Sequence, residues 1–424
     1  MAAALRYGWR MGAAPDIPSL TGLRFVAAAT IVLSHFGHAS GATLFGLEWN
    51  ISAVGMPLFF TLSGFIVHYV YAGAFARGWQ AAVPNFAIAR FSRLYPLFFA
   101  LLLFYCLGSL GRVFRAHWDI GISYATLTGS WWYWTADGTT ITTNRYGLSW
   151  SISTEVFFYL VYALGLYRIE RIRRVRHCAA AALGFGLFAG ALLYGLFASD
   201  PVWEPYLTAR YPHLISASAD VVNSFHRWLF YVSPYFHLLE FIAGCLTCQL
   251  FLLVQRSGTA AWRRAAEPLA WLGVTWLLAA LALLYATWYF GYRGHFFQFI
   301  NFLHLTFLMA PGCSLLILSL ALGGSSIGWA LGRRVPVYLG EISYSIYLGH
   351  SFFHWIMDSA GLSQPAYLMT VGLLLVVAGS SVLYFAIELP AKAWLRAGFA
   401  ALPRTALGRA TFNGRARGSL DVPR

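Results

Sequence analysis

Charged residues are scarce in this chain. Of its 424 residues only 10% are Asp, Glu, Lys or Arg, whereas 59% are hydrophobic and the mean hydropathy is +0.62. Soluble globular domains carry about 25% charged residues. The shortage of charge therefore excludes an ordinary soluble domain and predicts an all-α, polytopic membrane protein.

Lysine is almost absent, and acidic residues are few. The chain has 28 Arg and one Lys against 15 acidic residues, which gives a formal net charge of +14. A basic excess of this size indicates either nucleic-acid binding or the cytoplasmic bias of membrane loops. The positions of the basic residues along the chain decide between these two interpretations.

Membrane spans follow from the apolar runs. Each span needs about 20 predominantly apolar residues. On this basis the sequence predicts about ten transmembrane helices, near residues 17–39, 52–73, 92–111, 148–167, 178–198, 229–254, 267–290, 296–321, 336–358 and 366–388.

The basic residues segregate when these ten spans alternate in direction. With both termini cytoplasmic, 22 basic residues fall on the cytoplasmic side, 6 fall on the outer side, and Arg24 lies inside a helix. Arg and Lys collect in cytoplasmic loops of membrane proteins. Topology thus accounts for the charge, and nucleic-acid binding is not required.

Cysteine is also sparse, and no metal site is predicted. The five Cys lie almost entirely in apolar stretches, where they behave as small hydrophobic residues. Cys245 and Cys248 form a C-x2-C pair, but no second pair and no His at ligand spacing accompany it. We expect helix packing for this pair.

The chain divides into a membrane domain and two tails. Residues 1–16 form a short cytoplasmic tail without the features of a cleaved signal peptide. Residues 17–395 form the membrane domain. Residues 396–424 are polar, Gly-rich and basic toward the end, which predicts a disordered cytoplasmic tail.

Two outer loops are long, residues 112–147 and 199–228. The first contains Trp131, Trp132, Tyr133 and Trp134 in succession. Aromatic residues at this depth form the interfacial belt of membrane proteins, or they stack against a sugar acceptor. The sequence leaves both interpretations open.

Arg24 and His35 lie in the first predicted span, although an ionisable group in hydrocarbon is costly. Eleven residues separate them, which on an α-helix is a rise of about 16 Å and a rotation about 20° from three full turns. Both therefore lie on one face, and that face should line a cavity. The alternative is that Arg24 snorkels to the headgroups and His35 hydrogen-bonds a neighbouring helix.

The same spacing resembles the R-x10-H signature of the acyltransferase 3 family, integral membrane enzymes that O-acylate sugars and other cell-envelope molecules. The surrounding stretch IPSLTGLRFVAAATIVLSHF is similar to the family's opening motif. It differs at Thr21, where many members carry Asp, and this leaves the subfamily open.

Two further stretches resemble motifs of that family. GMPLFFTLSGF is similar to its FFxxSG motif and contains Ser63, although an SG pair is also typical of close helix packing. RFSRLYP is similar to its RxxR motif. The resemblance implies that Arg90 and Arg93, together with Arg24, bind the phosphates of acyl-coenzyme A; the alternative is cytoplasmic anchoring.

Glu155 lies in LSWSISTEVFFYL, which resembles the family's WSLSxE segment. Its predicted depth matches that of His35. A carboxylate beside an imidazole orients the ring and stabilises its cation, so His35 and Glu155 are the predicted catalytic residues. The alternative is a structural ion pair of Glu155 with an arginine.

The remaining motifs supply predicted substrate-binding residues. HLLEFIAGCL resembles the family's EFxxG segment, EISYSIYLGHSFFH resembles its ISYSxYLxH segment, and IELPAKAW resembles its closing segment, whose Glu388 receives no chemical role. With Ser63, the candidates are Glu240, Tyr344, Ser345, Tyr347 and His350.

The resemblance implies ten helices around a central acyl-donor cavity in a bacterial inner membrane. It implies an O-acyltransferase, most simply an O-acetyltransferase, with acyl-coenzyme A (most simply acetyl-coenzyme A) as donor substrate and no permanently bound cofactor or metal. The acceptor it implies is a hydroxyl of an exopolysaccharide, an O-antigen or a lipid-linked saccharide. The other partners it implies for the protein are membrane lipid and a polysaccharide-synthesis complex. A transporter or a structural subunit of a polysaccharide-export complex are the alternatives.

Overall fold

The computed structural model describes residues 15–40, 47–136, 139–140, 147–258, 260–292 and 294–401. Helices account for most of these residues, and the strands β1 (Thr135–Ala136) and β2 (Thr139–Thr140) form a short antiparallel pair. This architecture confirms the all-α prediction.

The first half of the described chain contributes five long helices and four short ones. Their bounds are α1 (Pro18–Ser40), α2 (Leu47–Arg77), α3 (Trp79–Cys106), α4 (Ser109–Ala116), α5 (Trp118–Ala125), η2 (Gly129–Trp131), α7 (Ser149–Leu164), η3 (Leu166–Arg171) and α8 (Val175–Arg210).

The second half continues the helical pattern, with π-helical turns inside two of its long helices. The bounds are α9 (Phe225–Arg227), η4 (Trp228–Val232), α10 (Pro234–Ser257), α11 (Ala260–Tyr289), α12 (His295–Leu303), α13 (Ala310–Leu322), α14 (Ser326–Leu331), α15 (Arg334–Glu341), α16 (Ser343–Ser359), α17 (Pro365–Tyr367), η5 (Leu368–Gly372), α18 (Leu373–Leu383), η6 (Tyr384–Glu388) and α19 (Leu389–Ala401).

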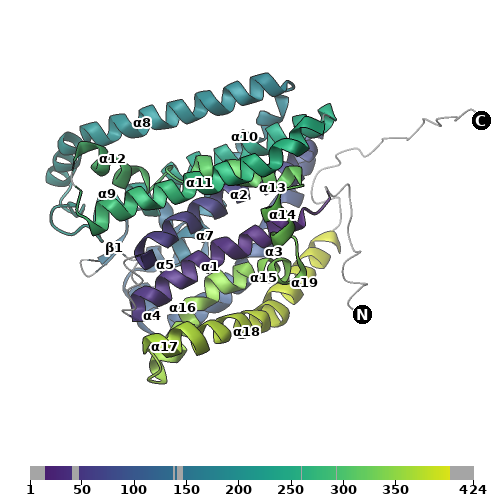
Figure 1. Ribbon diagram of the computed structural model, residues 1–424. Coiled ribbons are helices and arrows are strands. Elements are labelled where there is room, and N and C mark those ends of the chain that lie inside the picture. The colour runs from purple at the N-terminus through teal and green to yellow at the C-terminus, as the bar shows by residue number, and fades with distance from the viewer. Residues whose placement is uncertain are drawn as a thin grey trace, which may run out of the picture.

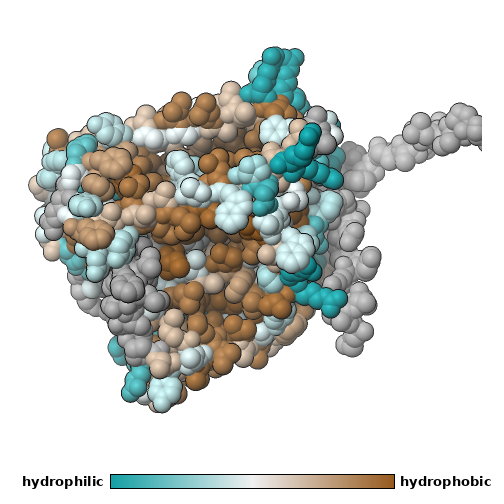
Figure 2. All heavy atoms as spheres, viewed as in Figure 1, coloured by the Kyte–Doolittle hydropathy of each residue, from teal (hydrophilic) through white to brown (hydrophobic). Residues whose placement is uncertain are grey.

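The long helices run side by side, and α1 begins at the same end of the bundle at which α19 ends (Figure 1). Hydrophobic residues cover the middle of the visible face, whereas the most hydrophilic residues gather at that end (Figure 2). An apolar band of this kind is what a bilayer requires of the lipid-facing surface.

Seven helices of the described chain are long and apolar enough to cross a membrane. They make the protein a multi-pass membrane protein, and the predicted number of about ten spans remains a prediction. The seven are 18–38, 51–77, 79–106, 175–210, 225–257, 261–289 and 368–399, and the apolar helix α13 is shorter.

Several predicted boundaries were wrong. α3 begins at Trp79 rather than at residue 92, and α8 continues to Arg210 rather than ending at 198. Both extensions contain prolines, which usually end helices in water but are tolerated in membrane helices because neighbouring groups satisfy the freed backbone. The predicted span 296–321 is two helices, α12 and α13, and the helix predicted to end at 388 continues through α19 to Ala401.

Two glycines allow α2 and α10 to pack in direct backbone contact. A Cβ on Gly64 would lie 2.0 Å from the Phe241 carbonyl oxygen, and a Cβ on Gly244 would lie 1.9 Å from that of Thr61. Small residues permit such close approach of membrane helices. This crossing places the cavity-facing side of α2 beside α7 and α3.

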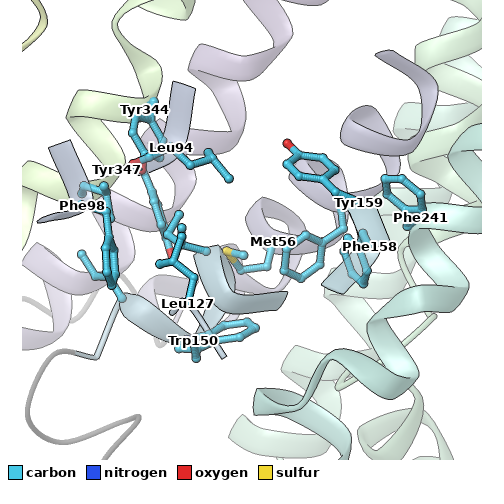
Figure 3. Packing of buried hydrophobic residues seen from close by; sticks show 14 of the residues in the cluster. Met56, Leu94, Phe98, Leu127, Trp150, Phe158, Tyr159, Phe241, Tyr344 and Tyr347 are labelled. Atoms are coloured by element: carbon cyan, nitrogen blue, oxygen red, sulfur yellow. Dashed lines mark hydrogen bonds between the residues drawn. The ribbon is translucent and has the colours of Figure 1, made fainter. Parts of the chain in front are cut away.

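A buried aromatic cluster surrounds the centre of the bundle. Figure 3 shows Met56, Leu94, Trp150, Tyr159 and Tyr344 converging from α2, α3, α7 and α16. The Tyr344 hydroxyl donates a hydrogen bond of 2.5 Å to the Leu94 carbonyl and so ties α16 to α3. Several residues of the cluster, among them Met56, Tyr344 and Tyr347, line the cavity described below.

Candidate active site

A cavity of about 240 Å³ lies between α1, α2, α3, α7 and α16. Seven of the predicted site residues line it, whereas His35, Glu240, Ser345 and His350 do not. The seven are Arg24, Ser63, Arg90, Arg93, Glu155, Tyr344 and Tyr347.

Three guanidinium groups give one part of the cavity a positive charge. Arg24 comes from α1, and Arg90 and Arg93 lie one turn apart on α3. Arg90 Nη2 donates to the Tyr71 hydroxyl at 3.1 Å, and its guanidinium lies 5.0 Å and 5.5 Å from the ring centres of Tyr71 and Tyr159. These contacts hold Arg90 in place without neutralising it.

Glu155 does not pair with His35 as the sequence predicted. Its Oε1 accepts a hydrogen bond from Ser63 Oγ at 3.0 Å and another from the Tyr159 hydroxyl. Tyr159 lies one turn further along α7, so helix geometry places its hydroxyl beside the carboxyl group. Glu155 therefore faces the cavity that Arg24 also lines.

The partner of His35 is His350. Nδ1 of His35 lies 2.7 Å from Nε2 of His350, and the ring centres are 5.0 Å apart. Nδ1 of His350 lies 2.7 Å from the Tyr347 carbonyl oxygen. His350 is 1% exposed, whereas His35 is exposed, so the pair has one buried and one accessible member.

These contacts fix which nitrogen carries each proton. A carbonyl oxygen accepts only, so His350 donates to Tyr347 through Nδ1–H. In neutral His350 the Nε2 atom is then the acceptor, and it receives the Nδ1–H of His35. Neutral His35 therefore keeps a lone pair on Nε2, which is the form that a general base needs.

Tyr347 stands between the cavity and the two histidines. Its hydroxyl lines the cavity and hydrogen-bonds Ser151 Oγ at 2.7 Å, while its carbonyl holds His350. Phe59 packs edge-on against its ring at 5.8 Å. Arg24 and His35 are about 16 Å apart along α1, and Tyr347 is in contact both with the cavity that Arg24 lines and with His350, the partner of His35.

Ser345 contacts a buried carboxyl group rather than the cavity. Its Oγ donates to Glu388 Oε2 at 2.9 Å, and Glu388 is 5% exposed. Glu388 in turn interacts electrostatically with Arg93, Lys392 and Arg24. Ser345, predicted to bind substrate, therefore contacts a carboxyl group that interacts with the cavity arginines.

Glu240 is buried away from the cavity. Its Oε2 lies 2.9 Å from His237 Nδ1, and His237 Nε2 donates to the Tyr231 carbonyl at 2.8 Å. The His237 ring stacks on Trp150 at 5.5 Å. His237 was not among the predicted site residues. Its position three residues before Glu240 in an apolar helix would have indicated that the two side chains interact.

The aromatic run of the first outer loop is mostly tied into the protein. Trp131 Nε1 donates to the Ser153 carbonyl at 3.0 Å, and the Tyr133 hydroxyl donates to the Asn223 carbonyl at 2.7 Å. Asn223 also donates to Asp220 through its backbone and side chain, which lowers the pKa of that carboxyl group. Trp132 is 55% exposed.

Comparison with known proteins identifies one family. Residues 17–385 match the sequence profile of a family described as an acyltransferase domain. The chain is also 26% identical over 265 residues to acyltransferase MdmB of Streptomyces mycarofaciens. The aligned region covers 58% of this chain and 59% of that protein.

A second similarity is shorter. The chain is 40% identical over 98 residues to protein 2 in the picA locus of Rhizobium radiobacter, covering 22% of this chain and 48% of that protein. The alignments thus span between about half and three fifths of the length of these two relatives. No solved structure matches the chain.

Proposed function

Because this chain belongs to the acyltransferase 3 family and is a multi-pass membrane acyltransferase, we propose that it moves an acyl group from acyl-coenzyme A to a hydroxyl of a cell-envelope glycan. Acetyl is the simplest group for this role, and an exopolysaccharide or O-antigen is the proposed acceptor. The observation that carries the proposal is a cationic cavity separated from a hydrogen-bonded histidine pair by Tyr347.

The cavity suits the donor. Arg24, Arg90 and Arg93 bring three guanidinium groups to a space of about 240 Å³. Guanidinium groups bind phosphate through paired, charge-assisted hydrogen bonds. In the proposed complex these arginines hold the diphosphate, and the pantetheine arm extends past Ser63 and Met56 toward Tyr347.

The histidine pair suits the acceptor. His35 Nε2 takes the proton of the acceptor hydroxyl as its oxygen attacks the thioester carbon, the carbon–sulfur bond breaks, and the coenzyme A thiolate takes that proton from His35. During this step His35 is transiently cationic. The chain of hydrogen bonds through His350 to the Tyr347 carbonyl stabilises that charge.

Tyr347 controls access between the two halves of the site. The thioester must pass its ring and that of Phe59 to reach His35. We propose that the Tyr347 side chain rotates away from Ser151 when the donor is bound. In the absence of the donor, the Tyr347 ring thus keeps water from passing between the two halves of the site.

The proposed orientation places the arginines toward the cytoplasm, where acyl-coenzyme A is made, and His35 toward the outer surface. The supporting observation is the distribution of 22 cytoplasmic against 6 outer basic residues in the ten-span interpretation. In that arrangement both termini are cytoplasmic and the protein resides in the bacterial inner membrane.

Incubation of the purified protein with labelled acetyl-coenzyme A and surface glycan tests the proposal. We expect labelled ester on the glycan and an equal amount of released coenzyme A. Absence of both transfer and coenzyme A binding in folded protein would contradict the proposed donor. Binding without transfer to any glycan hydroxyl would contradict the proposed acceptor.

A further inference from the structure

The single lysine of the chain lies on a cationic face of α19, next to the cavity arginines. Lys392 and Arg396 are four residues apart on α19 and therefore share one face of that helix, and Glu388 lies four residues before Lys392 at the end of η6. This face lies along α3, where Arg396 Nε donates to Ser92 Oγ at 3.3 Å. Lys392 interacts electrostatically with Arg396, Arg93 and Arg24.

Positive charge is in surplus around this face. Five cations, Arg24, Arg90, Arg93, Lys392 and Arg396, interact with one another and with two carboxyl groups, Glu155 and Glu388. Asp16 also lines the cavity, so two positive charges remain uncompensated even if all three carboxyl groups are ionised. Within the described chain, no carboxylate lies within 4 Å of the Lys392 ammonium.

A partly buried cluster of like charges is costly unless an anion accompanies it. Arg24, Arg90 and Arg93 line the cavity, whereas Lys392 and Arg396 do not. A diphosphate carries about two negative charges, and a phosphate monoester carries about 1.5 to 2 more. A diphosphate in the cavity faces the three lining arginines, so a second phosphate group is the part of a ligand that Lys392 and Arg396, outside the lining, can meet.

We propose that Lys392 and Arg396 form a second anion site, which binds the 3′-phosphate monoester of the acyl-coenzyme A donor. The inference rests on the proposed function, because it assigns one end of the same donor. Arg396 is exposed and lies two turns beyond Glu388, away from Tyr347. The 3′-phosphate is correspondingly at the end of coenzyme A most distant from the thioester.

The alternative role for Lys392 is neutralisation of Glu388, which already accepts a hydrogen bond from Ser345. The two roles predict different ligand selectivity. A residue that binds the 3′-phosphate lowers affinity only for ligands that carry this group. A residue that only supports Glu388 changes affinity for ligands with and without it to the same extent.

Equilibrium binding of coenzyme A and 3′-dephospho-coenzyme A to the purified full chain separates these roles. We expect the wild type to bind coenzyme A about 10-fold or more tightly than the dephospho form, since one charge-assisted contact is worth at least that factor. Lys392→Gln and Arg396→Gln should each reduce this ratio toward one while leaving affinity for the dephospho form unchanged. Lys392→Arg should retain most of the ratio.

Two control variants and a folding measurement accompany the titrations. Arg93→Gln should weaken binding of both ligands, because it contacts the proposed diphosphate site. Arg334→Gln, at the exposed start of α15, should weaken neither. Equal losses for both ligands in well-folded Lys392→Gln, or no loss for either, would overturn the second anion site. Failure of the wild type to bind either ligand would instead contradict the proposed function.

The single lysine also permits a direct observation. Reductive methylation with ¹³C-formaldehyde labels the Lys392 amine and the terminal amine, which differ in chemical shift. We expect the Lys392 resonance to move on addition of coenzyme A but not of 3′-dephospho-coenzyme A. A Lys392 resonance that responds equally to both ligands, or to neither, would overturn the assignment.

Discussion

His35 Nδ1 and His350 Nε2 are 2.7 Å apart, although the two residues are 315 positions apart in the chain. The contact joins α1 to α16. The Tyr347 carbonyl fixes the far side of the His350 ring. His350 is therefore a positioning residue in the proposed mechanism. It selects the tautomer of His35 whose Nε2 faces outward with a lone pair.

Replacing His350 tests this positioning role. His350→Ala should remove part of the roughly 10²- to 10⁴-fold rate that a positioned base supplies, because His35 loses its orienting acceptor. The apparent affinity for acyl-coenzyme A should stay near that of the wild type. His350→Gln should recover part of the loss, since its carboxamide oxygen can accept from His35 Nδ1–H. Turnover and donor binding are measured together in membranes; an unaltered rate in His350→Ala would refute the positioning role.

The cavity arginines should act on donor affinity. Arg90→Ala removes a guanidinium that Tyr71 and Tyr159 hold in place, and we expect a loss of about 1.5–3 kcal/mol in coenzyme A binding. Arg93→Ala should cost a similar amount. Titration calorimetry on detergent-solubilised protein measures both values. Unchanged binding in the double variant would return these arginines to a role in membrane anchoring.

The crossing of α2 and α10 should not tolerate a side chain. Gly64→Ala places a Cβ 2.0 Å from a backbone carbonyl oxygen, so the helices must separate, at a cost of about 1–3 kcal/mol in the free energy of unfolding. Gly184→Ala on α8 is a matched control, because no atom lies within 4 Å of its added Cβ. Thermal unfolding in detergent compares the two; equal stability would show that α2 and α10 do not pack this closely.

The topology prediction is tested by a reporter fused after residue 410. We expect a cytoplasmic signal, because only that orientation puts 22 basic residues inside and 6 outside. A fusion after His213, in the second predicted outer loop, should report the opposite side. A periplasmic signal from the residue 410 fusion would reverse the proposed direction of transfer.

The apolar runs of the sequence predicted most of the helices, and short local motifs predicted seven of the residues that line the cavity. Arg24 and His35, for example, were predicted to share a helix face that lines a cavity; Arg24 does line it, whereas His35 does not. Helix ends were predicted less well, since prolines such as Pro84 and Pro201 continue membrane helices that they would end in water.

Contacts between helices could not be predicted from the sequence. Depth along the membrane placed Glu155, His35 and His350 at one level, but depth does not say which helix faces point toward each other. In the structure Tyr159 and Ser63 donate hydrogen bonds to the Glu155 carboxyl group, and His350 rather than Glu155 is hydrogen-bonded to His35. Register between helices that are distant in sequence depends on the packing of the whole bundle.

The central claim is that His35 is the base in acyl transfer, and its replacement tests this claim most directly. Acylation turnover and coenzyme A binding are measured for His35→Gln and His35→Ala, with His213→Gln, an exposed histidine of an outer loop, as the control. Both His35 variants should bind the donor normally and lose about 10²- to 10⁴-fold in turnover, while the control keeps wild-type activity. Near-normal turnover in His35→Gln would contradict the account.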